Sequence, residues 1–202
     1  MNEFRIKNLI EYLEEQPEER VQKLLSSYSC PLNKDIEIFL HERSISFSKS
    51  SSARTFIVST KDAGQAVFVG YFTLTLKSLV LEDFREVSKS LEKKIKWFSD
   101  SYQIGNARES RTIQIASMIL IAQLGKNFAN GANKLITGQQ LLDVVIDEIT
   151  EIQKAVGGRF ICVECEDTPN LLNFYMANGF VRLQNRFTGR GDGYFVQLIR
   201  TS

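Results

Sequence analysis

The stretch Thr112-Ile-Gln-Ile-Ala-Ser-Met-Ile-Leu-Ile-Ala-Gln-Leu124 decides the fold, because apolar residues fill almost every position from 115 to 122. A run of this kind predicts a strand that is buried on both faces in the middle of a sheet. Apolar residues then recur at helical spacing over residues 138–155, and residues 159–165 are again rich in strand-forming side chains. A strand, a helix and a strand in this order predict a parallel pair joined by a crossover helix.

The rest of the chain predicts helices and hairpins on either side of this unit. Helical spacing of apolar residues indicates helices over residues 3–15, 17–28, 35–47 and 168–177. Strand-forming residues flank turn residues in two predicted hairpins, over residues 54–60 with 66–75 and 180–183 with 194–199. The lysine-rich segment 82–100 predicts an exposed basic helix or a lid-like insertion. Together these elements predict a mixed α+β domain around one sheet.

Composition indicates a single globular domain. The 202 residues fit one domain at about 150 residues per domain, and 43% hydrophobic with 24% charged residues is ordinary for a packed protein. No apolar run approaches the roughly 20 residues of a membrane helix, so we expect a cytoplasmic protein without membrane contact. The 25 basic and 24 acidic side chains nearly cancel, so a nucleic-acid partner requires a local basic patch. Three cysteines do not make a disulfide framework.

The loop between the central strand and the next helix, residues 125–136, is a candidate anion site. The first N–H groups of a helix lack partners within the helix and bind anions readily. Thr137 and Gln140 have the spacing of a capping box. Lys126, Lys134 and the glycines Gly125, Gly131 and Gly138 add charge and backbone access. The pattern fits a phosphate site, and it also fits an ordinary capped helix after a surface loop.

Two patterns that often carry chemistry have simpler interpretations in this chain. Cys162 and Cys165 have the spacing of a metal or redox motif, but an offset of three places them on opposite faces of a strand. Because no second cysteine pair completes four ligands, we expect core cysteines and no metal. His41, the single histidine, has no surrounding pattern that would form a catalytic triad and is expected at the surface or in the core.

Tyr175 follows Phe174 on the short helix after strand 159–165, so a phenol is expected near the C-terminal end of that strand. Open sheets bind ligands at that end. A tyrosine, with an ordinary pKa near 10, can donate a proton to a leaving group. The alternative is an aromatic packing residue. The nearby carboxylates are candidates for a base or an amine-binding group, although carboxylates at a strand end are more often solvated: Glu164, Glu166 and Asp167.

The stretch Leu171-Leu172-Asn173-Phe174-Tyr175-Met-Ala-Asn178-Gly179-Phe180 closely follows a Phe-Tyr-x-x-x-Gly-Phe signature. That signature belongs to the GNAT superfamily of N-acetyltransferases, which the chain resembles from about residue 28 to its C-terminus. Ile119-Leu-Ile-Ala-Gln123-Leu124-Gly125 stands where the superfamily has its fourth strand. The chain looks most like the acetyltransferase toxins of bacterial toxin-antitoxin systems, through Cys30-x-x-Asn33-x-Asp35-Ile-Glu-Ile-Phe39-Leu40, Arg54-Thr-Phe-Ile-Val58 and Val69-Gly70-Tyr71-Phe72-Thr73-Leu74.

The resemblance implies a fold and a reaction. The fold is a central, mostly antiparallel sheet with a splayed parallel pair and helices on both faces. Residues 30–202 would form the GNAT domain, with an insertion at about 82–111, and residues 1–29 an N-terminal helical extension. The implied reaction uses acetyl-CoA as co-substrate, with direct attack of an amine on the thioester and no covalent enzyme intermediate.

The resemblance also assigns site residues by position. Leu124, Gly125 and Lys126 would bind the pantetheine of acetyl-CoA. The pyrophosphate would lie against residues 134–139, which include Lys134, Thr137, Gly138 and Gln139. Tyr175 aligns with the frequent general acid, which protonates the departing CoA thiolate, and Asn173 is placed to reach the cofactor.

One loop departs from the superfamily. Its Arg/Gln-x-x-Gly-x-Gly/Ala pattern stands here as Asn133-x-x-Ile136-x-Gly138, so Ile136 is expected to obstruct a pyrophosphate. This departure supports an alternative, a GNAT-fold binding or regulatory module with a degenerate cofactor loop.

The predicted fourth strand, residues 112–124, carries no ionisable side chain that could serve as a base. About a tenth of an α-amine is neutral at pH 7, against well under a thousandth of a lysine side chain. The missing base therefore mildly favours an α-amine as the substrate.

Toxins of the resembled group acetylate the α-amine of aminoacyl-tRNA, so charged tRNA is one candidate substrate, beside a small amine or a protein N-terminus. An antitoxin protein and a homodimer are further partners that we consider. Two segments carry local positive charge. Residues 85–111 hold seven basic and four acidic residues, and in the last segment four arginines face one aspartate: Arg182, Arg186, Arg190, Arg200 and Asp192. On one shared surface, the two segments would form a phosphate-binding patch.

Overall fold

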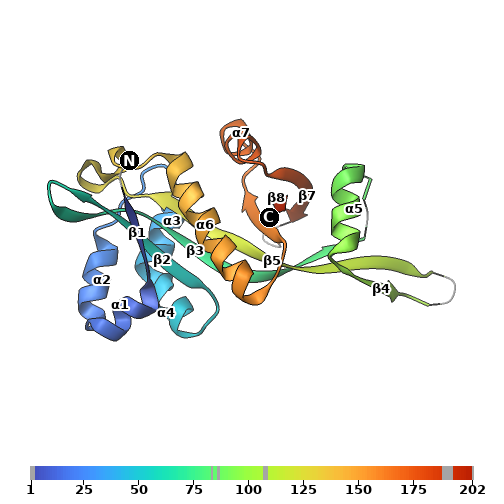
Figure 1. The fold of residues 1–202 in the computed structure, drawn as a ribbon, viewed down its shortest axis with the longest axis horizontal. Coiled ribbons are helices and arrows are strands. Elements are labelled where there is room, and N and C mark those ends of the chain that lie inside the picture. The colour runs from blue at the N-terminus through green and yellow to red at the C-terminus, as the bar shows by residue number, and fades with distance from the viewer. Residues whose placement is uncertain (1–2, 83, 86, 107–108, 188–192, 202) are drawn as a thin grey trace. The chain divides into compact units, whose positions relative to one another are not determined.

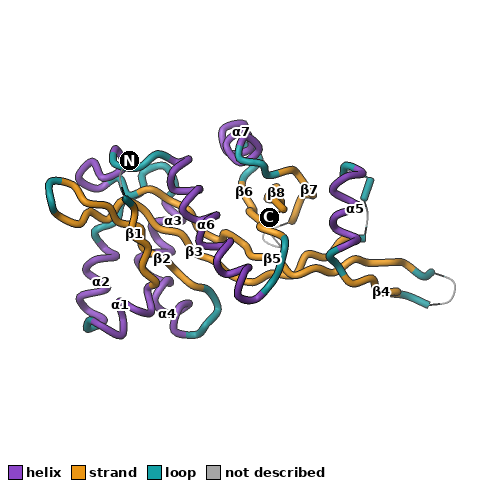
Figure 2. Tube along the Cα trace, in the orientation of Figure 1, coloured by secondary structure: helices purple, strands orange, loops and turns teal. Residues whose placement is uncertain are grey.

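The computed structural model describes residues 3–82, 84–85, 87–106, 109–187 and 193–201 (Figures 1 and 2). Arg108, Arg190 and Asp192 of the predicted basic patch lie outside these residues. The first half of the described chain forms β1 (Phe4–Asn8), α1 (Leu9–Glu15), α2 (Glu18–Ser26), α3 (Lys34–Ile38), a π-helical turn η1 (Phe39–Arg43), α4 (Ser44–Lys49), β2 (Arg54–Asp62) and β3 (Gln65–Leu81). The second half forms α5 (Lys89–Trp97), β4 (Asp100–Ile104), β5 (Arg111–Lys126), a 3₁₀ turn η2 (Ala129–Lys134), α6 (Gly138–Val156), β6 (Phe160–Cys165), α7 (Pro169–Ala177), β7 (Val181–Phe187) and β8 (Tyr194–Thr201).

The strands belong to one sheet in the order β1-β2-β3-β5-β6-β8-β7, with β4 pairing to β5. Antiparallel pairing joins β1 to β2, β2 to β3, β4 to β5, β6 to β8 and β7 to β8. Strands β5 and β6 are neighbours joined by helix α6, and a helical crossover makes such strands parallel. This confirms the predicted fold class, a mixed α/β domain whose sheet is mostly antiparallel with one parallel pair. None of the described helices is long and apolar enough to cross a membrane.

The chain divides into two compact units, the first of which comprises Met1–Thr75 and Ile121–Glu151. Its strand β3 is covered on both faces. A Cβ added to Gly70 would meet Leu141 of α6 at 3.2 Å. The next residue, Tyr71, instead contacts the ring of Tyr28 and donates from its hydroxyl to the carbonyl of Ile36 at 2.6 Å. Because successive strand residues point to opposite faces, α6 covers one face and the segment around residues 28–36 covers the other.

The second unit comprises Leu76–Leu120 and Ile152–Ser202. Leu91 and Ile95 of helix α5 are buried in a core that also contains Phe160 and Cys162 of β6. Met118 and Ile119 of β5 are both buried although they point to opposite faces, as predicted for this stretch of the strand. Cys165 is buried as well, which confirms the two cysteines as core residues.

One sequence prediction is wrong in part, and one strand was missed. The predicted helix over residues 3–15 begins only at Leu9, because Phe4–Asn8 pairs with β2 and the side chain of Asn8 caps the helix at Ile10 N. Strand β4 was not predicted, since four of the five side chains of Asp100–Ile104 are exposed and show no apolar alternation. Its pairing partner on β5 is what makes it a strand. The helix predicted over residues 35–47 is divided into α3, η1 and α4, and among the described residues of the segment 82–100 only 89–97 form a helix. The remaining predicted helices and both hairpins are present within a few residues of their expected bounds.

Candidate active site

The end of β5 is packed tightly at Gly125. A Cβ added there would stand 2.3 Å from the hydroxyl oxygen of Tyr28 and 2.9 Å from Ile36 Cγ2. Tyr28 is 2% exposed, and its hydroxyl has no hydrogen-bond partner among the described residues. Burial raises the pKa of this phenol, and the nearby Cys30 thiol adds to the shift. Residue 125 must therefore be glycine for the tyrosine to fit, and its neighbour Leu124 is half-buried.

Lys126 holds the loop after β5 in place. Its Nζ donates to the carbonyls of Asn133 at 3.1 Å and Ile136 at 3.2 Å, and it lies 5.8 Å from the ring centroid of Phe128. The side chain is half-buried, so both hydrogen bonds are partly shielded from water. The ammonium group is thus directed at the loop carbonyls, which sequence reasoning did not predict.

The loop itself turns through Asn130 and Gly131, whose φ angles of 51° and 76° lie in the left-handed region. Lys134 is exposed at the end of the 3₁₀ turn. Ile136 is 2% exposed, so its side chain is inside the protein. It does not stand at the loop surface, where the sequence placed an obstruction.

Helix α6 begins with the predicted capping box. The backbone N–H of Thr137 donates to Gln140 Oε1 at 2.9 Å, and the N–H of Gln140 donates to Thr137 Oγ1 at 3.1 Å. The side chain of Gln139 donates to Asp143 at 2.8 Å. A capping box leaves the N–H groups of the next two residues, here Gly138 and Gln139, at the open end of the helix. These two amides and exposed Lys134 are suited to a phosphate.

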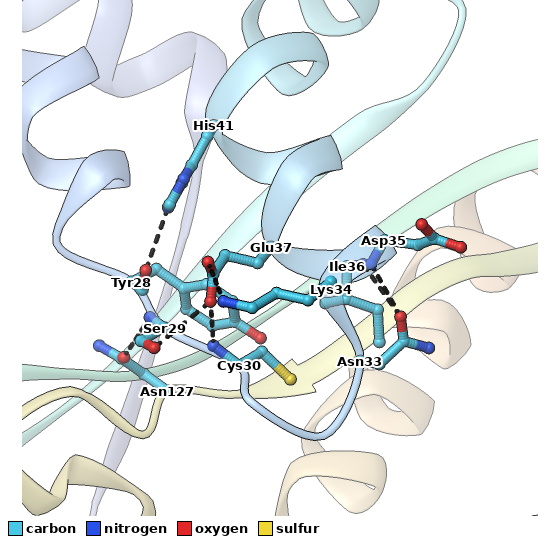
Figure 3. A network of polar contacts seen from close by, with 10 residues as sticks. All are labelled: Tyr28, Ser29, Cys30, Asn33, Lys34, Asp35, Ile36, Glu37, His41 and Asn127. Carbon is cyan, nitrogen blue, oxygen red and sulfur yellow. Dashed lines mark hydrogen bonds and ion pairs between the residues drawn. The ribbon is translucent and has the colours of Figure 1, made fainter.

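The covering segment 28–37 is fixed by Glu37 (Figure 3). One carboxylate oxygen accepts from the Cys30 N–H at 2.7 Å and from the Ser29 hydroxyl at 3.3 Å, and the other accepts from Lys34 Nζ at 2.7 Å. These donors, Lys34 first, lower the pKa of Glu37 to about 2. His41 contributes to the same turn, with Nε2 3.0 Å from the carbonyl of Tyr28.

Asn127 ties this segment to the end of β5. Its Oδ1 accepts from the N–H groups of Ser29 and Ala129, each at 3.0 Å, and its Nδ2 donates to the carbonyl of Phe68 at 2.9 Å. The N–H of Phe128 donates to the carbonyl of Ser29 at 2.8 Å. Sequence reasoning missed Asn127, and its only signal was an amide side chain directly after a predicted strand.

Tyr175 lies in the second unit, on α7. It is 8% exposed and packs edge-on to Phe180 and Phe174, with ring centroids 5.5 and 5.1 Å away. Burial raises its pKa, and Cys165 at the end of β6 adds to the shift. This places the phenol near the C-terminal end of β6, as predicted, and keeps it protonated. Asn173 is exposed on the same helix.

Two of the three carboxylates at the end of β6 are engaged by other side chains. Glu164 accepts from Lys77 at 2.6 Å and from Gln197 at 2.9 Å, and Arg186 lies 3.5 Å away. Asp167 accepts from Tyr194 at 2.9 Å and from Arg182 at 3.3 Å. Glu164 and Asp167 are therefore poorly placed to act as a free base, whereas Glu166 is exposed.

Neither protein-family models nor curated proteins match this sequence. Solved structures do. A tyrosine-to-phenylalanine mutant of KacT is similar with a TM-score of 0.63 and 17% identity, over 98% of this chain and 94% of that one. AtaT complexed with acetyl-methionyl-tRNAfMet is similar with a TM-score of 0.60 and 16% identity, over 96% and 94%. AtaTR bound with acetyl-CoA is similar with a TM-score of 0.56 and 14% identity, over 98% of this chain and 92% of that one.

The chain has the GNAT fold. The similarity to these toxins covers nearly the whole length of both partners, so it includes the N-terminal helices and the segment around α5. Seven of the eight predicted cofactor residues lie in the first unit, at the end of β5, in η2 and at the start of α6: Leu124, Gly125, Lys126, Lys134, Thr137, Gly138 and Gln139. Tyr175 and Asn173 lie in the second unit. No group of three or more metal-ligating side chains occurs in the part of the chain that the structure describes.

Proposed function

We propose that the protein is an acetyl-CoA-dependent N-acetyltransferase that transfers acetyl to a primary amine. The observation that supports this most is the fold similarity to AtaTR bound with acetyl-CoA, over 98% of this chain. The second support is local: a loop held by Lys126 leads into a capped helix with two open amides.

In this proposal, the main chain at Leu124, Gly125 and Lys126 binds the pantetheine. The side chain of Lys126 acts indirectly, because its Nζ already holds the carbonyls of Asn133 and Ile136. The pyrophosphate binds at residues 134–139 through the charge of Lys134 and the open amides of Gly138 and Gln139, and Thr137 can add only its hydroxyl hydrogen, since its N–H and Oγ1 are used in the capping box. Helix N-termini suit phosphates because their N–H groups and the helix dipole both favour negative charge.

The chemistry needs one proton donor. The neutral amine nitrogen attacks the thioester carbonyl, the carbon–sulfur bond breaks, and the CoA thiolate leaves. Tyr175 donates its phenolic proton to that sulfur, the amine loses its extra proton to water, and the tyrosinate takes a proton back from water. Burial raises the pKa of Tyr175, so the phenol is protonated at neutral pH, which is the form that a proton donor requires. Asn173, on the same helix, is proposed to contact the cofactor.

The proposed acceptor is the α-amine of aminoacyl-tRNA. AtaT, solved with acetyl-methionyl-tRNAfMet, has the same fold, and an α-amine is far more often neutral at pH 7 than a lysine side chain. An antitoxin protein and a homodimer belong to the same proposal. AtaT has been solved with the C-terminus of its antitoxin AtaR, at a TM-score of 0.52 to this chain.

The alternative, a GNAT-fold module without cofactor, depended on Ile136. The buried side chain of Ile136 favours the enzyme, because it leaves the start of α6 open.

Calorimetric titration with acetyl-CoA tests the proposal first. We expect micromolar binding and, with acetyl-CoA present, acetylation of aminoacyl-tRNA at a higher rate than of free amino acids or N-terminal peptides. Absence of binding at millimolar acetyl-CoA would overturn the proposal that the protein is an acetyltransferase. Binding together with faster acetylation of a peptide or small amine would overturn only the tRNA substrate.

A further inference from the structure

Helix α5 carries the largest exposed aromatic side chain of the protein. Trp97, the single tryptophan of the chain, is 78% exposed at the end of this helix. The helix itself is firmly oriented, because Leu91 and Ile95 are buried in the core of the second unit and Ser88 caps its start. An exposed tryptophan on a fixed helix is unusual, since large apolar surface is costly to leave in water.

Basic side chains surround this tryptophan on one face of α5. Lys89, Lys93 and Trp97 follow one another at intervals of four residues, which places them in one row along a helix. Lys96 and Glu92 join them in lining one shallow hollow. The face therefore combines a flat aromatic ring with a row of ammonium groups.

The lysines of α5 differ in what they bind. Lys96 pairs with Glu92 at 2.6 Å and lies over the ring of Phe84, and Lys94 donates to Thr201. Among the described residues, Lys89 and Lys93 have no ion-pair or hydrogen-bond partner. Two ammonium groups in the row are thus available to an external anion.

The arginines of the C-terminal hairpin are less available. Arg182 and Arg186 pair with Asp167 and Glu164, and Arg200 donates to the carbonyl of Asn178. Among the described residues, the predicted basic patch is therefore best developed on α5.

We propose that this face of α5, defined by Lys89, Lys93 and Trp97, binds a single-stranded segment of RNA. Trp97 stacks on a base, and Lys89 and Lys93 bind the phosphates beside it. Stacking on an aromatic side chain together with phosphate contacts is how proteins hold unpaired nucleotides. An acidic peptide would satisfy the lysines, but it has no flat group to cover the indole. The surface extends the proposed tRNA substrate and requires no acetyl transfer.

The fluorescence of Trp97 tests the proposal directly, because no other tryptophan contributes. The free protein, without acetyl-CoA, is titrated with a single-stranded RNA 12-mer, an abasic 12-mer of the same backbone, and a poly-glutamate peptide of equal charge. We expect quenching by the RNA that saturates, little quenching by the abasic chain, and weaker binding of the peptide. Absence of quenching by the RNA, or equal affinity for the peptide, would overturn the proposal, the latter in favour of a protein partner.

Variants separate the two contacts, with binding read by the anisotropy of labelled RNA. Lys89→Gln with Lys93→Gln should weaken binding at least fivefold and lower the slope of log K against log salt by about 1.4, at about 0.7 per single-strand phosphate contact. Lys94→Gln, on the same helix but directed at Thr201, is the matched control and should change affinity by less than twofold. Trp97→Leu should lower the affinity for the RNA about tenfold and leave the affinity for the abasic chain unchanged. Equal effects of the Lys89→Gln and Lys93→Gln double substitution and of Lys94→Gln, or an unchanged RNA affinity of Trp97→Leu, would contradict the proposed surface. Neither result bears on acetyl-CoA binding, so the two proposals fail separately.

Discussion

The hydroxyl of Tyr28 occupies the space that a side chain on Gly125 would need, 2.3 Å from the position of its Cβ. The two residues are far apart in sequence and come from the covering segment and the end of β5. The contact holds the end of β5 against the covering segment. The proposed cofactor site begins at this end of β5. It also explains the glycine at position 125 by packing, independently of any ligand.

Gly125→Ala should therefore destabilise the protein, by about 1–3 kcal/mol, as overpacked core positions do. Adding Tyr28→Phe should restore part of this loss, since the hydroxyl is the nearest clash, while Ile36 at 2.9 Å remains. Urea unfolding of both single variants and the double variant measures the coupling. Strictly additive losses would show that Tyr28 is not what limits position 125.

Tyr28→Phe and Tyr71→Phe form a matched pair in the same cluster. The hydroxyl of Tyr71 donates to the Ile36 carbonyl at 2.6 Å, whereas that of Tyr28 has no partner among the described residues. Tyr71→Phe should lower the free energy of unfolding by about 1 kcal/mol, and Tyr28→Phe should leave it unchanged or raise it. Equal losses in thermal unfolding would contradict this contrast.

Lys126 and Lys134 should separate stability from cofactor binding. Lys126→Met removes two hydrogen bonds to the loop carbonyls and should cost about 1–2 kcal/mol in urea unfolding. Lys134→Met removes an exposed charge and should leave stability within about 0.5 kcal/mol. It should nevertheless weaken acetyl-CoA binding several-fold in calorimetry. A destabilised Lys134→Met, or one with unchanged affinity, would remove Lys134 from the proposed site.

Glu37 should make stability depend on acid. Its pKa is lowered to about 2 in the folded protein, from an ordinary value of 4.5, so the folded state favours the ionised form. The resulting stabilisation is complete above about pH 5 and is lost as pH falls towards 2. The difference in free energy of unfolding between wild type and Glu37→Gln should shrink over this range. A difference that is constant from pH 6 to pH 2.5 would contradict the assignment.

Local patterns of the sequence predicted the fold well, but they could not predict contacts between residues that are distant in the sequence. The capping box of Thr137 and Gln140 was predictable because both partners lie within one helical turn. Strand β1 was not, since its pairing with β2 joins segments about fifty residues apart. The resemblance to GNAT motifs assigned Gly125 and Lys126 to the cofactor by position. It could not indicate that Tyr28 packs against Gly125, or that the ammonium group of Lys126 donates to the loop carbonyls.

Acetyl transfer by wild type and Tyr175→Phe tests the central claim most directly. Each protein is given acetyl-CoA and aminoacyl-tRNA, the acetylated product is measured by mass spectrometry, and acetyl-CoA affinity is measured in parallel. Wild type should form product, and Tyr175→Phe should lose a factor of about 10² or more in kcat with unchanged affinity, because only the proton donor is removed. Phe174→Leu, on the same helix, serves as the control and should retain most of the rate. Product at the same rate from Tyr175→Phe would contradict the assigned acid, and no acetylated amine from wild type on any acceptor would contradict the acetyltransferase itself.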